Sequence, residues 1–200
     1  TSVTGVQTCA LPICMDTDLV LRAQAGDRGA FARIADEILD RYLAIAHRIL
    51  RDGALAEDAT QAALLGIWRD LPKLREADRF GAWSTKLLVN ACYSEARRAK
   101  RWLPNLPLES TPEPATPDEI GPILDRDLLD RAFHDVPVDQ RAVIVLHHYV
   151  GRPVETVAQT RDIPAGTVRS RMHRGLATLR AAMEAADRPT ISPVRQEATR

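Results

Sequence analysis

Six prolines between residues 104 and 122 divide this chain into two parts. Proline lacks an amide hydrogen and its ring clashes with the preceding helical turn, so this segment cannot form a continuous helix. Its charged side chains are all acidic, and it contains few apolar residues to bury. We therefore expect a flexible linker over residues 104–124, with a folded domain on each side.

Apolar residues before the linker recur in steps of three and four, the spacing of one helix face. The clearest stripe follows Asp27, the predicted N-cap, and comprises Phe31, Ile34, Ile38, Tyr42, Ile45 and Ile49. Weaker patterns predict helices over 18–25, 55–71 and 79–101. The predicted inner side of the last consists of Phe80, Trp83, Leu87 and Ala91. Four helices with short connections predict a compact bundle over residues 15–103.

Helical patterns also follow the linker and predict a second, smaller domain over residues 125–186. A short helix is expected from Pro153 to about Thr160, then a turn over 162–166 and a long helix from Thr167. The remaining residues, 187–200, form a polar tail. Aromatic residues make up only 4% of the chain, and its apolar residues are mostly Ala, Leu, Ile and Val. We therefore predict an all-α fold of two helical domains.

The final helix divides into an apolar and a basic side when its residues are spaced at about 100°. The predicted core stripe comprises Val168, Met172, Leu176 and Leu179, and the opposite side comprises Ser170, Arg171, Arg174 and Thr178. A short helix, a turn and a basic second helix are typical of a helix-turn-helix, whose second helix enters the major groove. Arginine can read guanine through O6 and N7, while Thr167 and the free amides of the first turn suit a phosphate. The alternative interpretation is a solvated basic face.

The run VPVDQRAVIVLHHYVGRPVETVAQTRDIPAGTVRSRMHRGLATLR, residues 136–180, resembles region 4 of the sigma-70 family and is most similar to its extracytoplasmic-function (ECF) group. The segment with the spacing IPxGTVxSRxxR carries most of this resemblance. It implies binding to the −35 promoter element and to the beta flap of RNA polymerase. The implied −35 residues are Thr167, Arg169, Ser170, Arg171 and Arg174.

Two segments of the first domain resemble region 2 of the same family: AEDATQAALLGIWRDLPKL (56–74) and RFGAWSTKLLVNACYSEARRAKRW (79–102). The first implies docking on the clamp helices of the largest polymerase subunit, and the second implies opening and reading of the −10 element. The implied docking residues are Asp58, Gln61, Leu65 and Trp68. The implied −10 residues are Asn90, Tyr93, Arg97, Arg98, Lys100 and Arg101. Leu65 and Trp68 could instead be ordinary core residues.

The resemblance implies a sigma factor that directs bacterial RNA polymerase to promoters and is regulated by an anti-sigma factor. An enzyme is disfavoured, because we find no phosphate-binding loop, dinucleotide turn or catalytic constellation with mechanistic spacing. No cofactor or metal is expected, since adjacent His147 and His148 point about 100° apart on a helix. Two alternatives are a helix-turn-helix regulator acting without polymerase and an adaptor that binds polymerase without DNA.

The charge balance, the first 14 residues and the lengths of the apolar runs give three further expectations. With 27 basic and 27 acidic residues, the chain cannot be uniformly basic, so a DNA site requires local clustering of charge. Residues 1–14 lack helical periodicity and precede Met15, so we expect them to be a non-native leader. No apolar run approaches the roughly 20 residues that cross a bilayer, and a cytoplasmic protein without a membrane partner is expected.

Overall fold

The computed structural model describes residues 15–102 and 129–186, which fold into helices without any strand. The predicted all-α fold is therefore confirmed for these ranges. The predicted leader, linker and tail lie outside the described residues.

The first group of helices consists of α1 (Thr17–Gln24), α2 (Arg28–Leu50), α3 (Gly53–Asp70) and α4 (Phe80–Trp102). Two short 3-10 turns, η1 (Leu71–Lys73) and η2 (Ala77–Arg79), connect α3 to α4. As predicted, the Asp27 carboxylate caps α2 by accepting a hydrogen bond from the Ala30 amide at 3.0 Å. Asp52 caps α3 in the same way, through the Leu55 amide at 2.8 Å.

The core of this group follows the α2 stripe, where Ile34, Ile38, Tyr42, Ile45 and Ile49 are buried as predicted. Phe31, the first residue of the predicted stripe, is only half-buried and packs against this core. The prediction for α4 is partly wrong. Phe80 is buried, but Trp83, Leu87 and Ala91 are only half-buried, and the fully buried residues are Ser84, Thr85, Leu88, Val89 and Cys92. The Ser84 and Thr85 hydroxyls donate to the Phe80 and Gly81 carbonyls at 2.6 Å each, so these polar side chains are satisfied within their own helix.

The second group begins with helical residues 129–134 and continues with α6 (Val138–Ile144) and the π-helical turn η3 (Val145–Tyr149). It ends with α7 (Val154–Arg161) and α8 (Ala165–Ala186). The predicted short helix is present, with Pro153 as its N-cap rather than in its first turn. A left-handed Asp162, with φ of 53°, ends α7 and turns the chain toward α8.

A glycine sets the contact between α8 and α6. The predicted core stripe of α8 is wrong at Leu176, which is 37% exposed, whereas Gly175 is buried. A Cβ atom on Gly175 would lie 2.6 Å from Ile144 Cδ1 and 3.2 Å from Gln140 Cβ. The missing side chain therefore lets α8 approach α6 closely.

Gly175→Leu is expected to lower the free energy of unfolding by about 2 kcal/mol, because the new side chain overpacks the contact between α8 and α6. Gly166→Leu in the same helix is a suitable control, since no atom of residues 15–102 or 129–186 lies within 4 Å of a Cβ atom at Gly166, apart from its own neighbours in the chain. Urea unfolding followed by circular dichroism measures both. Equal stability of the two variants would contradict this explanation of the glycine.

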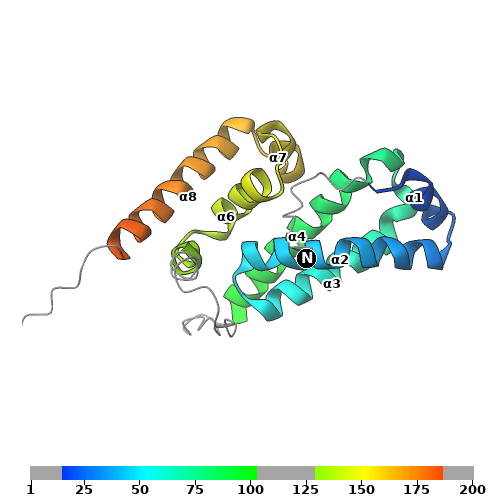
Figure 1. Cartoon of the computed structure of the whole chain (residues 1–200), viewed down its shortest axis with the longest axis horizontal. Helices are drawn as coiled ribbons and strands as arrows, with labels where there is room; N and C mark the ends of the chain where they lie inside the picture. Colours follow the sequence, from blue (N-terminus) through cyan, green and yellow to red (C-terminus); the bar gives the residue numbers. More distant parts are fainter. Residues whose placement is uncertain (1–14, 103–128, 187–200) are drawn as a thin grey trace, which may run out of the picture.

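The two groups of helices also pack against each other, as Figure 1 shows, with α7 against α4 and α6 against α2. One cluster of buried apolar side chains extends from α2 and α4 to Val143, Leu146 and Val157 of the second group. The sequence predicts a folded domain on each side of a linker. It does not predict the contact between the domains, because that contact depends on residues far apart in the chain.

Candidate nucleic-acid interface

The turn between α7 and α8 forms the predicted helix-turn-helix. Helix α8 begins at Ala165, two residues before the predicted start. The Thr167 amide therefore already donates to the Pro164 carbonyl at 2.9 Å and is not a free group of the first turn. Val157 and Val168 are buried in the same core and hold α7 against α8. The outer face of α8 is thus supported by a packed second helix, as a groove-reading helix requires.

The predicted −35 residues on α8 do not all point the same way. Ser170 and Arg174 lie on the exposed face, where the Arg174 Nε donates to the Ser170 carbonyl at 3.3 Å. Arg169 is also exposed, and its Nη2 lies 3.0 Å from Glu155 Oε1 of α7. The predicted grouping of Arg171 with the outer face is wrong: only 24% of its side chain is exposed, and its Nε lies 3.1 Å from Asp139 Oδ2 of α6.

A second basic surface lies at the end of α4. Arg97, Lys100 and Arg101 are exposed and line a shallow depression. Arg98 is also exposed, but its Nη2 lies 2.7 Å from Asp58 Oδ2 of α3 and 2.8 Å from Glu95 Oε2. Three of the four predicted phosphate-binding cations therefore face one depression, and the fourth bridges α4 to α3.

Asn90 and Tyr93, the predicted base contacts of α4, meet an arginine from the other group of helices. The Arg161 Nη1 at the end of α7 donates to Asn90 Oδ1 at 3.2 Å. The same guanidinium lies 3.7 Å from the centroid of the Tyr93 ring, a cation–π contact. Sequence spacing cannot identify Arg161 as their partner, because Asn90 lies 71 residues away.

The predicted docking residues all lie on the exposed side of α3. Leu65 is 65% exposed and Trp68 is 40% exposed, so neither is an ordinary core residue. The Trp68 ring rests edge-on against Phe31 of α2, with 4.6 Å between ring centroids. Small residues, Ala56, Ala59 and Ala63, face inward instead and bring α3 close to its neighbours. The result is an outward strip that joins Asp58 and Gln61 to two large apolar side chains.

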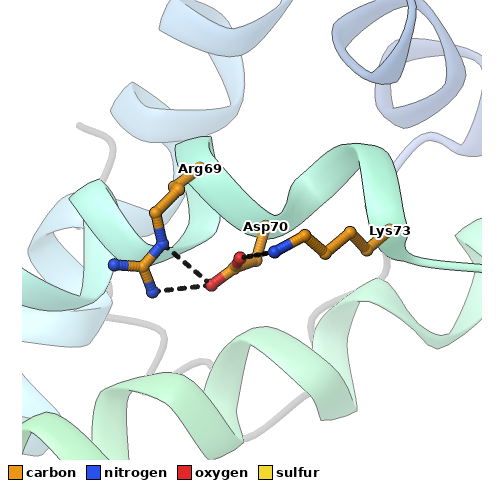
Figure 2. A network of polar contacts seen from close by, with 3 residues as sticks. All are labelled: Arg69, Asp70 and Lys73. Atoms are coloured by element: carbon orange, nitrogen blue, oxygen red, sulfur yellow. Dashed lines mark hydrogen bonds and ion pairs between the residues drawn. The ribbon is translucent and has the colours of Figure 1, made fainter.

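At the C-terminal end of α3, the Asp70 carboxylate forms ion pairs with two basic side chains. Figure 2 shows Arg69 and Lys73 converging on Asp70 from opposite sides. The Arg69 Nη2 and Lys73 Nζ each lie 2.7 Å from an Asp70 oxygen. Hydrogen bonds from Arg69 and then Lys73 lower the pKa of Asp70 to about 2. The charged form of Asp70 therefore stabilises the turn into η1.

This pKa shift makes a specific pH dependence expected. Because the pKa of Asp70 is lower in the folded than in the unfolded protein, its contribution to stability is present above about pH 4 and disappears toward pH 2. Asp70→Asn should lower the melting temperature at pH 7 and should converge with the parent protein near pH 2. Asp36→Asn, at an exposed position on α2, is the control. A constant difference at every pH would exclude Asp70 ionisation as the cause.

The described ranges, 15–102 and 129–186, contain no group of His, Cys, Asp and Glu side chains that could hold a metal ion. In those same ranges, no helix combines the length and apolar character needed to cross a membrane. His147 and His148 lie with their ring centroids 4.7 Å apart, and the His147 Nδ1 is 2.8 Å from the Arg152 carbonyl oxygen. The His147 ring is thus engaged with the backbone.

Two family models match this chain. The model described as Sigma-70 region 2 matches residues 34–102, and the model described as Sigma-70, region 4 matches residues 126–179. The chain is 32% identical over 161 residues to the RNA polymerase sigma factor CarQ of Myxococcus xanthus, a match that covers 80% of this chain and 92% of CarQ. It is also 32% identical over 175 residues to the ECF RNA polymerase sigma factor SigM of Mycobacterium tuberculosis, with 82% of each chain covered.

Solved structures show the same similarity. The sigma factor RpoE from Bartonella quintana, in complex with the anti-sigma factor NepR, gives a TM-score of 0.64 at 25% identity over 79% of this chain and 98% of that chain. The structure of CnrH in complex with the cytosolic domain of CnrY gives a TM-score of 0.62 at 20% identity and covers 85% of this chain and 97% of that one. The second match is a similarity of fold.

Proposed function

The chain belongs to the ECF group of the sigma-70 family, and we propose that α3, α4 and α8 respectively bind core polymerase, the −10 element and the −35 element. A member of this family is a transcription initiation factor and not an enzyme. It directs bacterial RNA polymerase to promoters. The alternative of a helix-turn-helix regulator without polymerase binding is not favoured, because the first group of helices matches sigma region 2 and not a ligand-binding or receiver module.

The observation that carries this proposal is the outward strip on α3. An exposed Leu65 and Trp68 next to Asp58 and Gln61 combine apolar area with polar specificity, as transferable protein interfaces do. A regulator that acts on DNA alone would have no use for such a strip beside a basic α4. We propose that the clamp helices of the largest polymerase subunit bind it, and that the beta flap contacts the second group of helices.

The two DNA surfaces use different chemistry in this proposal. The exposed Arg174, Ser170 and Arg169 of α8 enter the major groove of the −35 element, with Arg171 and Thr167 at the edge of the contact. The cations Arg97, Arg98, Lys100 and Arg101 bind phosphates beside the −10 element. Asn90 and Tyr93 contact a base that has left the stack, since a ring face stacks on any base.

The proposed domain division assigns residues 15–103 to region 2 and 125–186 to region 4, with residues 104–124 as the linker.

Polymerase and promoter DNA are in the bacterial cytoplasm, so we propose that this sigma factor acts there. The similarity to RpoE, which was solved with an anti-sigma factor, supports a regulatory partner of that class.

Run-off transcription on a promoter library tests the function directly. Core polymerase with this protein should give promoter-dependent transcripts, and core polymerase alone should not. The transcripts should share sequence near −35 and −10. Their absence with a folded protein would overturn the proposal.

A further inference from the structure

Arg161 contacts Asn90 and Tyr93, the two side chains of α4 that we propose to bind a −10 base. Its Nη1 donates to Asn90 at 3.2 Å, and its guanidinium covers the Tyr93 ring at 3.7 Å. On the basis of that proposed function, we propose that the free protein is closed on itself: the helix-turn-helix half covers the −10 face of α4, and Arg161 is the residue that blocks it. A base and a guanidinium cannot stack on the same ring face together.

Further contacts support the closed arrangement away from Arg161. The Arg48 guanidinium of α2 lies 4.0 Å from the centroid of the Tyr149 ring in η3. The Arg51 Nη2, at the end of α2, lies 3.1 Å from Asp130 Oδ1. These contacts and the shared apolar cluster connect α2 and α4 to several parts of the second group of helices. The position of Arg161 is therefore part of a continuous interface.

The closed arrangement also buries one nitrogen of Arg161 that makes no hydrogen bond to a described residue, which favours reversible closure. The Nε atoms of Arg141 and Arg161 are buried without a hydrogen bond to any residue that the structure describes. Burial, together with the nearby Arg51, lowers the pKa of Arg141 to about 10. A buried donor without a partner destabilises the state that buries it. Opening restores hydration to the Arg161 Nε and so offsets part of the cost of separating the apolar cluster when DNA or polymerase binds the open state.

In the closed arrangement the outward strip on α3, the proposed polymerase-binding surface, stays exposed. Leu65 and Trp68 remain exposed in the same structure in which Tyr93 is half-buried under Arg161. The closed protein can therefore bind core polymerase before it can capture a −10 base. This order would keep a free sigma factor from holding single-stranded DNA without polymerase.

Closure can be measured by distances between spin labels, without DNA. Lys86→Cys on α4 and His173→Cys on α8 place labels at exposed positions in the two groups. Cys9 and Cys14 are replaced by Ser, and Cys92 stays unlabelled because it is buried and burial raises its pKa to about 12. The parent protein should give one narrow distance distribution, which Arg161→Glu should broaden toward longer distances. Arg180→Glu, an exposed change on α8, should leave it narrow.

The consequence for DNA is tested with a labelled pool of random 12-nucleotide single strands and the free full-length protein. Arg161→Ala should bind the pool about 5- to 10-fold more tightly than the parent, although it removes a positive charge. Adding Tyr93→Ala should remove this gain. Arg180→Ala, which also loses one charge, should bind no more tightly than the parent.

Circular dichroism and urea unfolding establish that each variant is folded. A broad parent distance distribution, or one unaffected by Arg161→Glu, would overturn the closed state. Unchanged or weaker DNA binding by Arg161→Ala would overturn its blocking role. Neither result would affect promoter-dependent run-off transcription by the parent protein. A failure of the closed state can therefore be distinguished from a failure of the proposed function.

Discussion

Replacing Asp58 with arginine and Gln61 with alanine is expected to weaken binding to core RNA polymerase by about 100-fold or more, equivalent to roughly 3 kcal/mol. Both side chains are exposed on α3, beside Leu65 and Trp68. The change introduces a positive charge at the centre of the proposed interface and removes a polar contact one helical turn away. Since neither residue contributes to the core, the helical circular-dichroism signal should be retained.

Pull-down of core polymerase, followed by titration with a labelled polymerase, measures the loss. Asp36→Arg provides a matched control, because it makes the same charge reversal at an exposed position on α2. It should bind as the parent does. A folded Asp58→Arg, Gln61→Ala variant that is still pulled down would move the docking surface to another part of the protein.

The double replacement Arg171→Ala, Arg174→Ala is expected to remove most recognition of the −35 element. Each arginine that reads a base is worth about 1–3 kcal/mol of discrimination. The larger single effect should come from Arg174, which is exposed, since Arg171 has to exchange its ion pair with Asp139 for a base. Asp139→Ala should therefore reduce the difference between the two positions.

Binding of the reconstituted holoenzyme to a selected promoter, compared with the same promoter carrying a scrambled −35 element, measures this loss. The arginine variants should lose affinity for the intact promoter and little for the scrambled one. Arg180→Ala serves as a control at an exposed position on the same helix. Equal losses on both DNAs would show that these arginines bind phosphates and do not read bases.

Local features of the fold were predictable from the sequence. The α2 stripe and its Asp27 cap follow from helical spacing and capping chemistry alone, and both are confirmed. For Leu65 and Trp68, the sequence alone does not distinguish a core position from an exposed interface position. The alanines on the inner face of α3 explain why the larger side chains point outward.

Features that depend on a neighbouring helix were harder to predict. Angular spacing placed Leu176 in the α8 core, but the close approach of α6 requires a residue without a side chain, and Gly175 supplies it. The same spacing put Arg171 on the outer face, since it takes no account of Asp139 on α6. In α4, helix-internal hydrogen bonds allowed Ser84 and Thr85 to replace apolar residues in the core. The role of Arg161 could not be predicted either, because it depends on how the two groups of helices pack against each other.

The ion pair between Asp58 and Arg98 joins the outward strip on α3 to the basic end of α4. A protein that takes Asp58 from this pair releases a cation at the end of α4, where DNA phosphates are proposed to bind. Thermodynamic reciprocity then requires that DNA held by Arg98 also increases affinity at Asp58. Both side chains are about half exposed, and Glu95 also holds Arg98, so this linkage is worth no more than a few-fold in either affinity. Its sign nevertheless makes the α3 and α4 surfaces cooperative, so that promoter capture and polymerase retention strengthen each other.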